Sequence, residues 1–170
     1  SRRRHTRYIS VTGVSDVCSS DLVFGNEFVR RRYQLSLHRH PLEQPLLDFA
    51  PQMGRQWGLP VEAYQGTVAD LEEGVPLRLG DDQIDVLFTP GHSPGSCSFL
   101  ARREGWVISG DVLFQESIGR TDLPGGNLQT LLESIRAQLF PLPDDTVVHS
   151  GHGPSTTIGH EKAFNPFLIV

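Results

Sequence analysis

Apolar residues recur every three or four positions in three stretches of the chain, a spacing that places them on one face of a helix. The first predicted helix begins near Val23, the second spans 42–57 and the third spans 128–139. Gly58 and Pro60 follow the second stretch, where the end of a helix is expected. Asn127 precedes the third stretch as a predicted N-cap, and Pro141 ends it.

In other stretches apolar and polar residues alternate, which is the period of a strand with one buried face. The predicted strands span 33–37, 77–79, 84–88, 97–101, 106–108 and 146–148. The turn residues Gly80-Asp81-Asp82 separate the second and third strands, so these two strands are expected to form a hairpin. Paired strands with interspersed helices predict a layered α/β or α+β domain.

The length and composition favour one globular unit, because the chain has 170 residues of which 38% are hydrophobic. No apolar run approaches the roughly 20 residues that span a bilayer, and no apolar signal segment follows the N-terminal arginines. We therefore expect a cytoplasmic protein without a membrane partner. Its two cysteines, Cys18 and Cys97, form no thiolate cluster, so nitrogen and oxygen ligands would hold any metal.

Charge is distributed unevenly along the chain. Residues 1–40 contain eight arginines and three acidic residues, a net charge of +5. Residues 41–170 have a net charge of −10, which gives the whole chain −5. A basic arm that binds nucleic acid is one interpretation. We favour the alternative of a solvated helix face, because no aromatic residues alternate with the arginines, and we expect no nucleic-acid partner.

The first residues of the chain are distinct from the rest. Residues 11–22 show neither helical nor strand periodicity, and they resemble the translation of a common sequencing adapter. We interpret residues 1–22 as a non-native segment and assign residues 23–170 to the domain.

Three predicted strands each lead to a glycine that is followed by a potential metal ligand. These ligands are His92 after Thr89-Pro90-Gly91, Asp111 after Ser109-Gly110 and His152 after Ser150-Gly151. Glycine lets the backbone turn sharply at a strand end, so the side chains can converge at one edge of a sheet. Imidazole and carboxylate groups suit Zn²⁺, Fe or Mn in a site that is open to water. The same spacing also fits loop residues that bind no metal.

Four motifs resemble the metallo-β-lactamase superfamily, most closely its glyoxalase II-like thioester hydrolases. In chain order they are TPGHSPGS at 89–96, SGDVLF at 109–114, GRTDLPGGN at 119–127 and GHGPSTTIGHEKAFNPF at 151–167. The resemblance covers residues 23–170 and implies an αββα sandwich. It further implies that His92 binds a first metal, that Asp111 bridges two metals as the catalytic carboxylate, and that His152 binds the second metal.

The resemblance also implies a reaction. Two zinc ions, with Fe or Mn as alternatives, would lower the pKa of a bound water and polarise a substrate carbonyl. The expected substrate is a small thioester such as a hydroxyacyl-glutathione, which the resulting hydroxide attacks. Two other interpretations stay open: an iron-dependent persulfide dioxygenase of the same fold, which the GRTD motif resembles, and an inactive, metal-free remnant.

The family's HxHxDH motif is absent from the chain. It would occupy about 16–22, where Asp21 falls on the aspartate of the motif and Leu22 replaces its last histidine. The first strands of the family's initial sheet are also missing, so the sandwich is expected to be incomplete at its N-terminus. We therefore predict that this chain binds metal poorly and folds marginally, because Val, Ser and Leu cannot replace imidazole ligands.

Several polar residues near these motifs have competing interpretations. Arg120 either pairs with Asp122 to brace its loop or binds an anionic substrate. His38 and His40 have HxH spacing, which would put both rings on one face of a strand, but they follow the first helix and are not expected to bind metal. His160 is expected at the surface of a last short helix.

A serine hydrolase is the rival mechanism. The residues Gly91-His92-Ser93-Pro94-Gly95 match G-x-S-x-G, and Ser93, Asp111 and His152 follow the chain order of the α/β-hydrolase triad. A nucleophile elbow needs a helix directly after the serine, whereas residues 96–99 alternate like a strand. We therefore favour the metal interpretation over Ser93.

Overall fold

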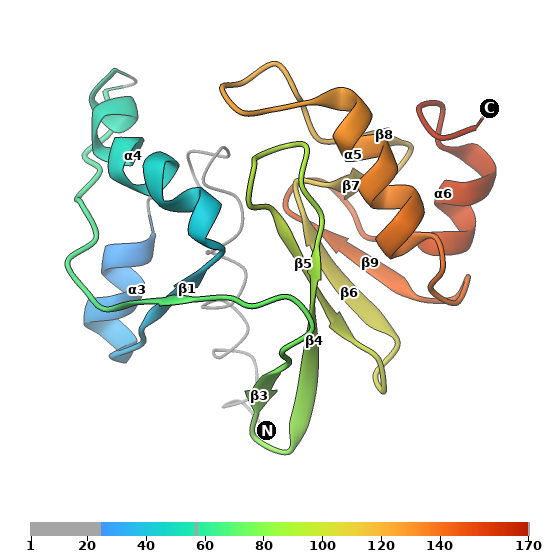
Figure 1. Cartoon of the computed structure of the whole chain (residues 1–170), viewed down its shortest axis with the longest axis horizontal. Coiled ribbons are helices and arrows are strands. Elements are labelled where there is room, and N and C mark those ends of the chain that lie inside the picture. The colour runs from blue at the N-terminus through green and yellow to red at the C-terminus, as the bar shows by residue number, and fades with distance from the viewer. Residues whose placement is uncertain (1–24, 57, 170) are drawn as a thin grey trace. The chain divides into compact units, whose positions relative to one another are not determined.

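The computed structural model describes residues 25–56 and 58–169 (Figure 1). The interpretation of residues 1–22 as non-native lies outside these ranges, and so do the predictions that concern Cys18, Asp21, Leu22 and Val23. The chain divides into two compact units, Ser1–Leu71 and Glu72–Val170. Among the described residues, no helix combines the length and the apolar character that crossing a membrane requires.

The described residues of the first unit form two helices, a 3₁₀ turn and a two-stranded parallel sheet. These elements are α3 (Asn26–Tyr33), β1 (Leu37–Arg39), η2 (Pro41–Glu43), α4 (Gln44–Gln56) and β2 (Val68–Asp70). The strand predicted around 33–37 lies further along the chain, because α3 continues to Tyr33 and β1 begins at Leu37. Gln34 then ends the helix in the left-handed conformation, with φ 55° and its N–H donating to the Arg30 carbonyl.

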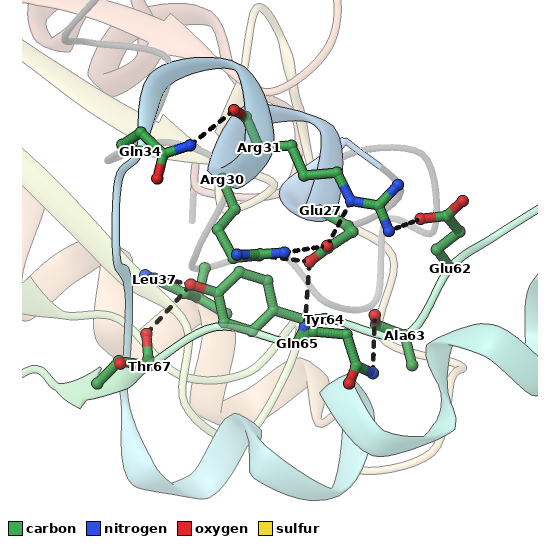
Figure 2. A network of polar contacts seen from close by, with 10 residues as sticks. All are labelled: Glu27, Arg30, Arg31, Gln34, Leu37, Glu62, Ala63, Tyr64, Gln65 and Thr67. Carbon is green, nitrogen blue, oxygen red and sulfur yellow. Dashed lines mark hydrogen bonds and ion pairs between the residues drawn. The ribbon is translucent and has the colours of Figure 1, made fainter.

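A buried carboxylate ties α3 to the segment that leads to β2 (Figure 2). Glu27 is 3% exposed and accepts two hydrogen bonds from the Arg30 guanidinium, at 2.8 and 2.6 Å. It also accepts hydrogen bonds from Arg31 Nε at 2.8 Å and from the backbone N–H of Gln65 at 3.1 Å. These donors, Arg30 above all, lower the pKa of Glu27 from 4.5 to about 2. A single side chain thus fixes the loop to the helix.

Six strands form the main sheet of the second unit, in the spatial order β10-β9-β6-β5-β4-β3. They are β3 (Leu77–Leu79), β4 (Asp82–Phe88), β5 (Cys97–Ala101), β6 (Trp106–Gly110), β9 (Val147–Ser150) and β10 (Thr156–Thr157). The predicted hairpin of β3 and β4 is confirmed, with Leu79 opposite Asp82. β6 and β9 pair in parallel, and the other neighbours are antiparallel. A separate hairpin consists of β7 (Leu113–Phe114) and β8 (Ser117–Ile118).

Helices α5 (Leu128–Ser134) and α6 (Ile158–Phe164), with the π-helical continuation η3 (Ile135–Leu139), complete the second unit (Figure 1). Leu131 and Ile135 from the helices belong to one apolar cluster with Leu100 and Val107 from the sheet. Removing this surface from water is the main stabilising term for the unit. The predicted N-cap is confirmed, since Asn127 Oδ1 accepts the N–H of the third helical residue at 2.9 Å. The mixed α/β class predicted from the sequence is therefore correct.

Candidate metal centre

Three strands of the main sheet run in the same direction and end at the same edge. β4 is antiparallel to β5, β5 is antiparallel to β6, and β6 is parallel to β9. His92 follows β4, Asp111 follows β6 and His152 follows β9. The last two loops are joined directly, because the N–H of Gly151 donates to the Gly110 carbonyl at 2.8 Å. The structure thus brings all three predicted residues to one edge of the sheet.

The imidazole of His92 is buried, with 1% of the residue exposed, and its two nitrogens differ. Nδ1 lies 2.8 Å from the backbone oxygen of Arg120. A carbonyl oxygen only accepts hydrogen bonds, so Nδ1 carries a hydrogen, and the tautomer that this contact selects has its lone pair on Nε2. Nε2 is buried without a hydrogen-bond partner among the described residues and lies 3.7 Å from Asp111 Oδ2.

The loop that carries His92 is held by backbone contacts to the helix beside it. The Gly91 carbonyl accepts the N–H of Asn127 at 2.7 Å, and the Pro90 carbonyl accepts the Ser134 hydroxyl at 2.7 Å. Gly91 has φ 133°, and a Cβ at this position would overlap the backbone of Leu131. Only glycine therefore lets the loop approach α5 so closely.

Asp111 lies between the two histidines and is 4% exposed. Its Oδ1 accepts a hydrogen bond from Nδ1 of His152 at 2.9 Å. Glycines approach the aspartate from two sides, because a Cβ at Gly119 would overlap its backbone oxygen and a Cβ at Gly151 would overlap Oδ1. The His152 side chain is 48% exposed and stands edge-on to Phe114. This edge of the site is therefore open to solvent on the His152 side.

The donor atoms fit part of a metal site. In the described segments, no three His, Cys, Asp or Glu side chains are grouped closely enough to hold an ion by themselves. His92 Nε2, which is buried without a hydrogen-bond partner, nevertheless lies 3.7 Å from a carboxylate oxygen of Asp111. A cation bound here would contact both atoms, and imidazole nitrogen with carboxylate oxygen is a usual donor set for zinc and iron. A closed coordination shell needs further donors.

The side chain of Arg120 is braced by its neighbour Asp122. Its Nε and Nη2 donate to the two carboxylate oxygens of Asp122, each at 2.8 Å, and both side chains are mostly exposed. The hydrogen bond from Arg120 is the main cause that lowers the pKa of Asp122 from 3.8 to about 2. The hydrogen bonds to Asp122 thus support the interpretation that Arg120 braces its loop, whereas binding of substrate by Arg120 stays a prediction.

The remaining histidines singled out in the sequence lie in other settings. His40 follows β1 and its Nδ1 accepts the N–H of Leu42 at 3.3 Å, so it caps the turn η2. The HxH pair therefore does not lie together on one strand. His160 is partly exposed and its Nε2 pairs with Glu116 Oε1 at 3.0 Å.

Ser93 is enclosed within its own loop and is fully buried. Its hydroxyl lies 2.7 Å from the Ser96 hydroxyl, which also accepts the N–H of Ser93 at 3.2 Å. The chain after this loop enters β5 rather than a helix. The local context of a nucleophile elbow is therefore missing.

Sequence reasoning missed the contact that orients His92. The Arg120 carbonyl that holds Nδ1 is a backbone group, and any residue type at this position offers the same oxygen. The residue that comes closest to a sequence signal for this contact is the neighbouring Gly119, because the absence of a Cβ there leaves room for the backbone of Asp111.

Comparison with known proteins gives one family. Residues 20–152 match the family model described as Metallo-beta-lactamase superfamily. Hydroxyacylglutathione hydrolase GloC from Haemophilus influenzae is 43% identical over 124 residues, which cover 72% of this chain and 58% of the relative. The chain thus spans less than two thirds of that relative's length.

Solved structures extend the similarity to the fold. The structure of TTHA1623 in a di-iron-bound form is 42% identical with a TM-score of 0.79, and the match covers 87% of this chain and 72% of that chain. ETHE1 from Myxococcus xanthus is 31% identical with a TM-score of 0.56, and the match covers 77% and 72%.

Proposed function

The chain belongs to the metallo-β-lactamase superfamily, and we propose that its complete site is that of a metal-dependent hydrolase for a small thioester of the hydroxyacyl-glutathione class. The observation that carries the proposal is the buried, unpartnered Nε2 of His92, which faces the carboxylate of Asp111 at 3.7 Å. A buried polar atom without a partner costs free energy, and a cation bound to Nε2 would satisfy it. The relative named hydroxyacylglutathione hydrolase supports the substrate class.

His92, Asp111 and His152 are the residues that would hold the metal. A bound divalent cation supplies Lewis acidity toward a carbonyl and activates water at neutral pH. The Arg120 carbonyl fixes the His92 tautomer that presents Nε2. Asp111 supplies negative charge and orients His152 through the 2.9 Å hydrogen bond. Hydrolysis adds water across the carbon–sulfur bond and releases a carboxylic acid and a thiol.

Two competing outcomes share these side chains. An iron-dependent persulfide dioxygenase would use the same histidines and carboxylate, and the structural similarity to ETHE1 keeps this activity as a rival. A metal-free remnant is the second rival, because HxHxDH is absent from this chain. The dioxygenase would bind iron and oxidise a persulfide, whereas the remnant would bind no metal and form no product.

The test is metal binding and product formation by the purified chain. The metal-free protein is titrated with Zn²⁺ and, under anaerobic conditions, with Fe²⁺, and thiol release is followed with a hydroxyacyl-glutathione. The matched variants are His152→Ala and His149→Ala, since His149 lies on β9 and pairs with Ser155 at 2.9 Å. We expect His152→Ala to weaken zinc binding by at least about 10-fold, and His149→Ala to leave it unchanged.

Thiol release that requires zinc and His152 supports the hydrolase. Oxygen uptake with a persulfide by the iron-loaded chain, without thiol release from the thioester, identifies the dioxygenase instead. Absence of bound metal in both titrations makes this chain the remnant. We expect fewer than two zinc ions per chain, because the HxHxDH ligands are absent.

A further inference from the structure

A buried carboxyl group on the last helix has no role in the site described above. Glu161 on α6 is fully buried. Its Oε2 accepts the backbone N–H of Glu116 at 2.9 Å and Nδ2 of Asn165 at 2.8 Å, and its Oε1 accepts the Thr156 hydroxyl at 2.5 Å. Three donors satisfy a carboxylate that burial would otherwise make costly.

One partner of Glu161, the backbone N–H of Glu116, lies at the tip of the β7–β8 hairpin. Glu116 occupies the turn with φ 53°, a conformation that a non-glycine residue adopts only when its surroundings hold it there. Asn165 Nδ2 also donates to the carbonyl of Ser117 at 3.0 Å. The helix therefore binds both an N–H and a carbonyl of this turn.

The two arms of the hairpin lead to different parts of the candidate site. β7 follows Asp111, and the Leu113 carbonyl accepts the hydroxyls of Ser109 and Ser150 at 3.0 and 2.8 Å. The main sheet thus fixes the β7 arm directly. β8 leads through Gly119 to the Arg120 carbonyl that holds His92 Nδ1. On the β8 side, strand pairing with β7 and the Gly119 N–H, which donates to the Val112 carbonyl at 3.3 Å, tie the arm to its neighbour. At the tip, Glu161 and Asn165 bind the backbone of Glu116 and Ser117, and His160 Nε2 pairs with the Glu116 side chain at 3.0 Å.

We propose that Glu161 is a positioning residue, which fixes the tautomer and orientation of His92 through the β8 arm and the Arg120 carbonyl. The inference rests on the proposed function only in taking His92 as a metal ligand. In this proposal α6 fixes the orientation of His92, whereas the main sheet holds Asp111 and His152. Loss of Glu161 should therefore disturb one histidine and not the other.

The test measures both imidazoles in the metal-free protein. Two-bond proton–nitrogen NMR spectra of chain labelled with ¹⁵N-histidine report which ring nitrogen carries the hydrogen. The variants are Glu161→Met, which keeps the volume but removes the acceptor, and Glu161→Gln, which keeps one acceptor oxygen. Lys162→Met is the control on the same helix, because Lys162 pairs at the surface with Asp144 at 2.6 Å.

In the parent we expect a single His92 tautomer with the hydrogen on Nδ1. Glu161→Met should move both His92 nitrogen shifts toward an average of the two tautomers and leave the His152 shifts unchanged. Glu161→Gln should restore the parent spectrum, and Lys162→Met should match it. Where the variants bind zinc, Glu161→Met should bind it at least about 10-fold more weakly than Glu161→Gln.

A folded Glu161→Met with the parent His92 spectrum overturns the proposal, and so does an equal disturbance of His92 and His152. If Glu161→Met does not fold, Asn165→Leu tests the same link between α6 and the hairpin, because it removes the hydrogen bonds from Asn165 to Ser117 and to Glu161 and retains the carboxylate. The His92 spectra require no metal. A parent chain that binds no zinc would therefore contradict the proposed function in this chain and leave the positioning result intact.

Discussion

The hydrogen bond between His92 Nδ1 and the Arg120 carbonyl, at 2.8 Å, determines which ring nitrogen is available to a ligand. The lone pair on Nε2 is left facing Asp111 Oδ2 at 3.7 Å. Metal-binding histidines are usually held through their other nitrogen in this manner. A buried imidazole nitrogen without a hydrogen-bond partner is unfavourable for folding, and a cation bound at Nε2 would satisfy it.

Asp111→Asn should have opposite effects on stability and on metal binding. The amide can donate to His92 Nε2 and still accept from His152 Nδ1, so the metal-free variant should gain about 1 kcal/mol in free energy of unfolding. It should lose zinc affinity, because the carboxylate charge is gone. Urea unfolding and zinc titration of both proteins check this. A metal-free variant less stable than the parent would contradict it.

Gly151→Ala should separate metal binding from backbone strain. A Cβ at this position overlaps Asp111 Oδ1, so the carboxylate must move and zinc affinity should fall. Gly153→Ala is the matched control, since Gly153 has φ 80° and open space around it. It should cost about 1–2 kcal/mol of stability through strain alone and leave zinc affinity unchanged. Equal zinc affinities in the two variants would show that Gly151 does not shape the site.

The long alternating stretches were predictable from sequence and the short elements were not. β5 was predicted with its observed bounds, and the β3–β4 hairpin was marked by the turn at Gly80. β7, β8 and β10 contain two residues each, which is too short for any alternation to appear. The end of α3 was misplaced because Gln34 adopts a left-handed backbone conformation, which is uncommon for glutamine and could not be predicted from the residue type.

The placement of the candidate ligands was predictable for a topological reason. A strand followed by glycine and then by His or Asp occurs three times, and parallel directions of β4, β6 and β9 bring these ends to one edge. The contacts that orient the ligands were hidden from the sequence. One is a backbone carbonyl at Arg120, and another is Glu161, which is 50 residues from Asp111 in sequence and acts through a hairpin tip.

Glu27→Gln should remove a pH dependence from the stability of the chain. The pKa of Glu27 is lowered to about 2 in the folded state from 4.5, so its contribution is complete above about pH 4.5 and is lost as the pH falls toward 2. The parent should therefore lose stability between pH 5 and pH 2 more steeply than the variant. Urea unfolding at several pH values measures this. Glu62→Gln, at an exposed partner of Arg31, is the control and should keep the parent's pH profile.

Arg120→Met should distinguish the backbone role of this residue from the role of its side chain. The carbonyl that holds His92 persists in the variant, so zinc affinity should stay within about twofold of the parent, far less than the 10-fold change expected when a supporting contact is lost. The pKa of Asp122, now about 2, should rise toward its ordinary value because its main hydrogen-bond donor is gone. Zinc titration and an NMR titration of the Asp122 carboxyl check these two expectations.

Steady-state kinetics of the same variant test whether the guanidinium binds an anionic substrate. If it does, KM for the hydroxyacyl-glutathione should increase while kcat is retained, and an unchanged KM limits Arg120 to bracing its loop. A large loss of zinc affinity would contradict the backbone assignment, because it would mean that the pair with Asp122 holds the carbonyl in place.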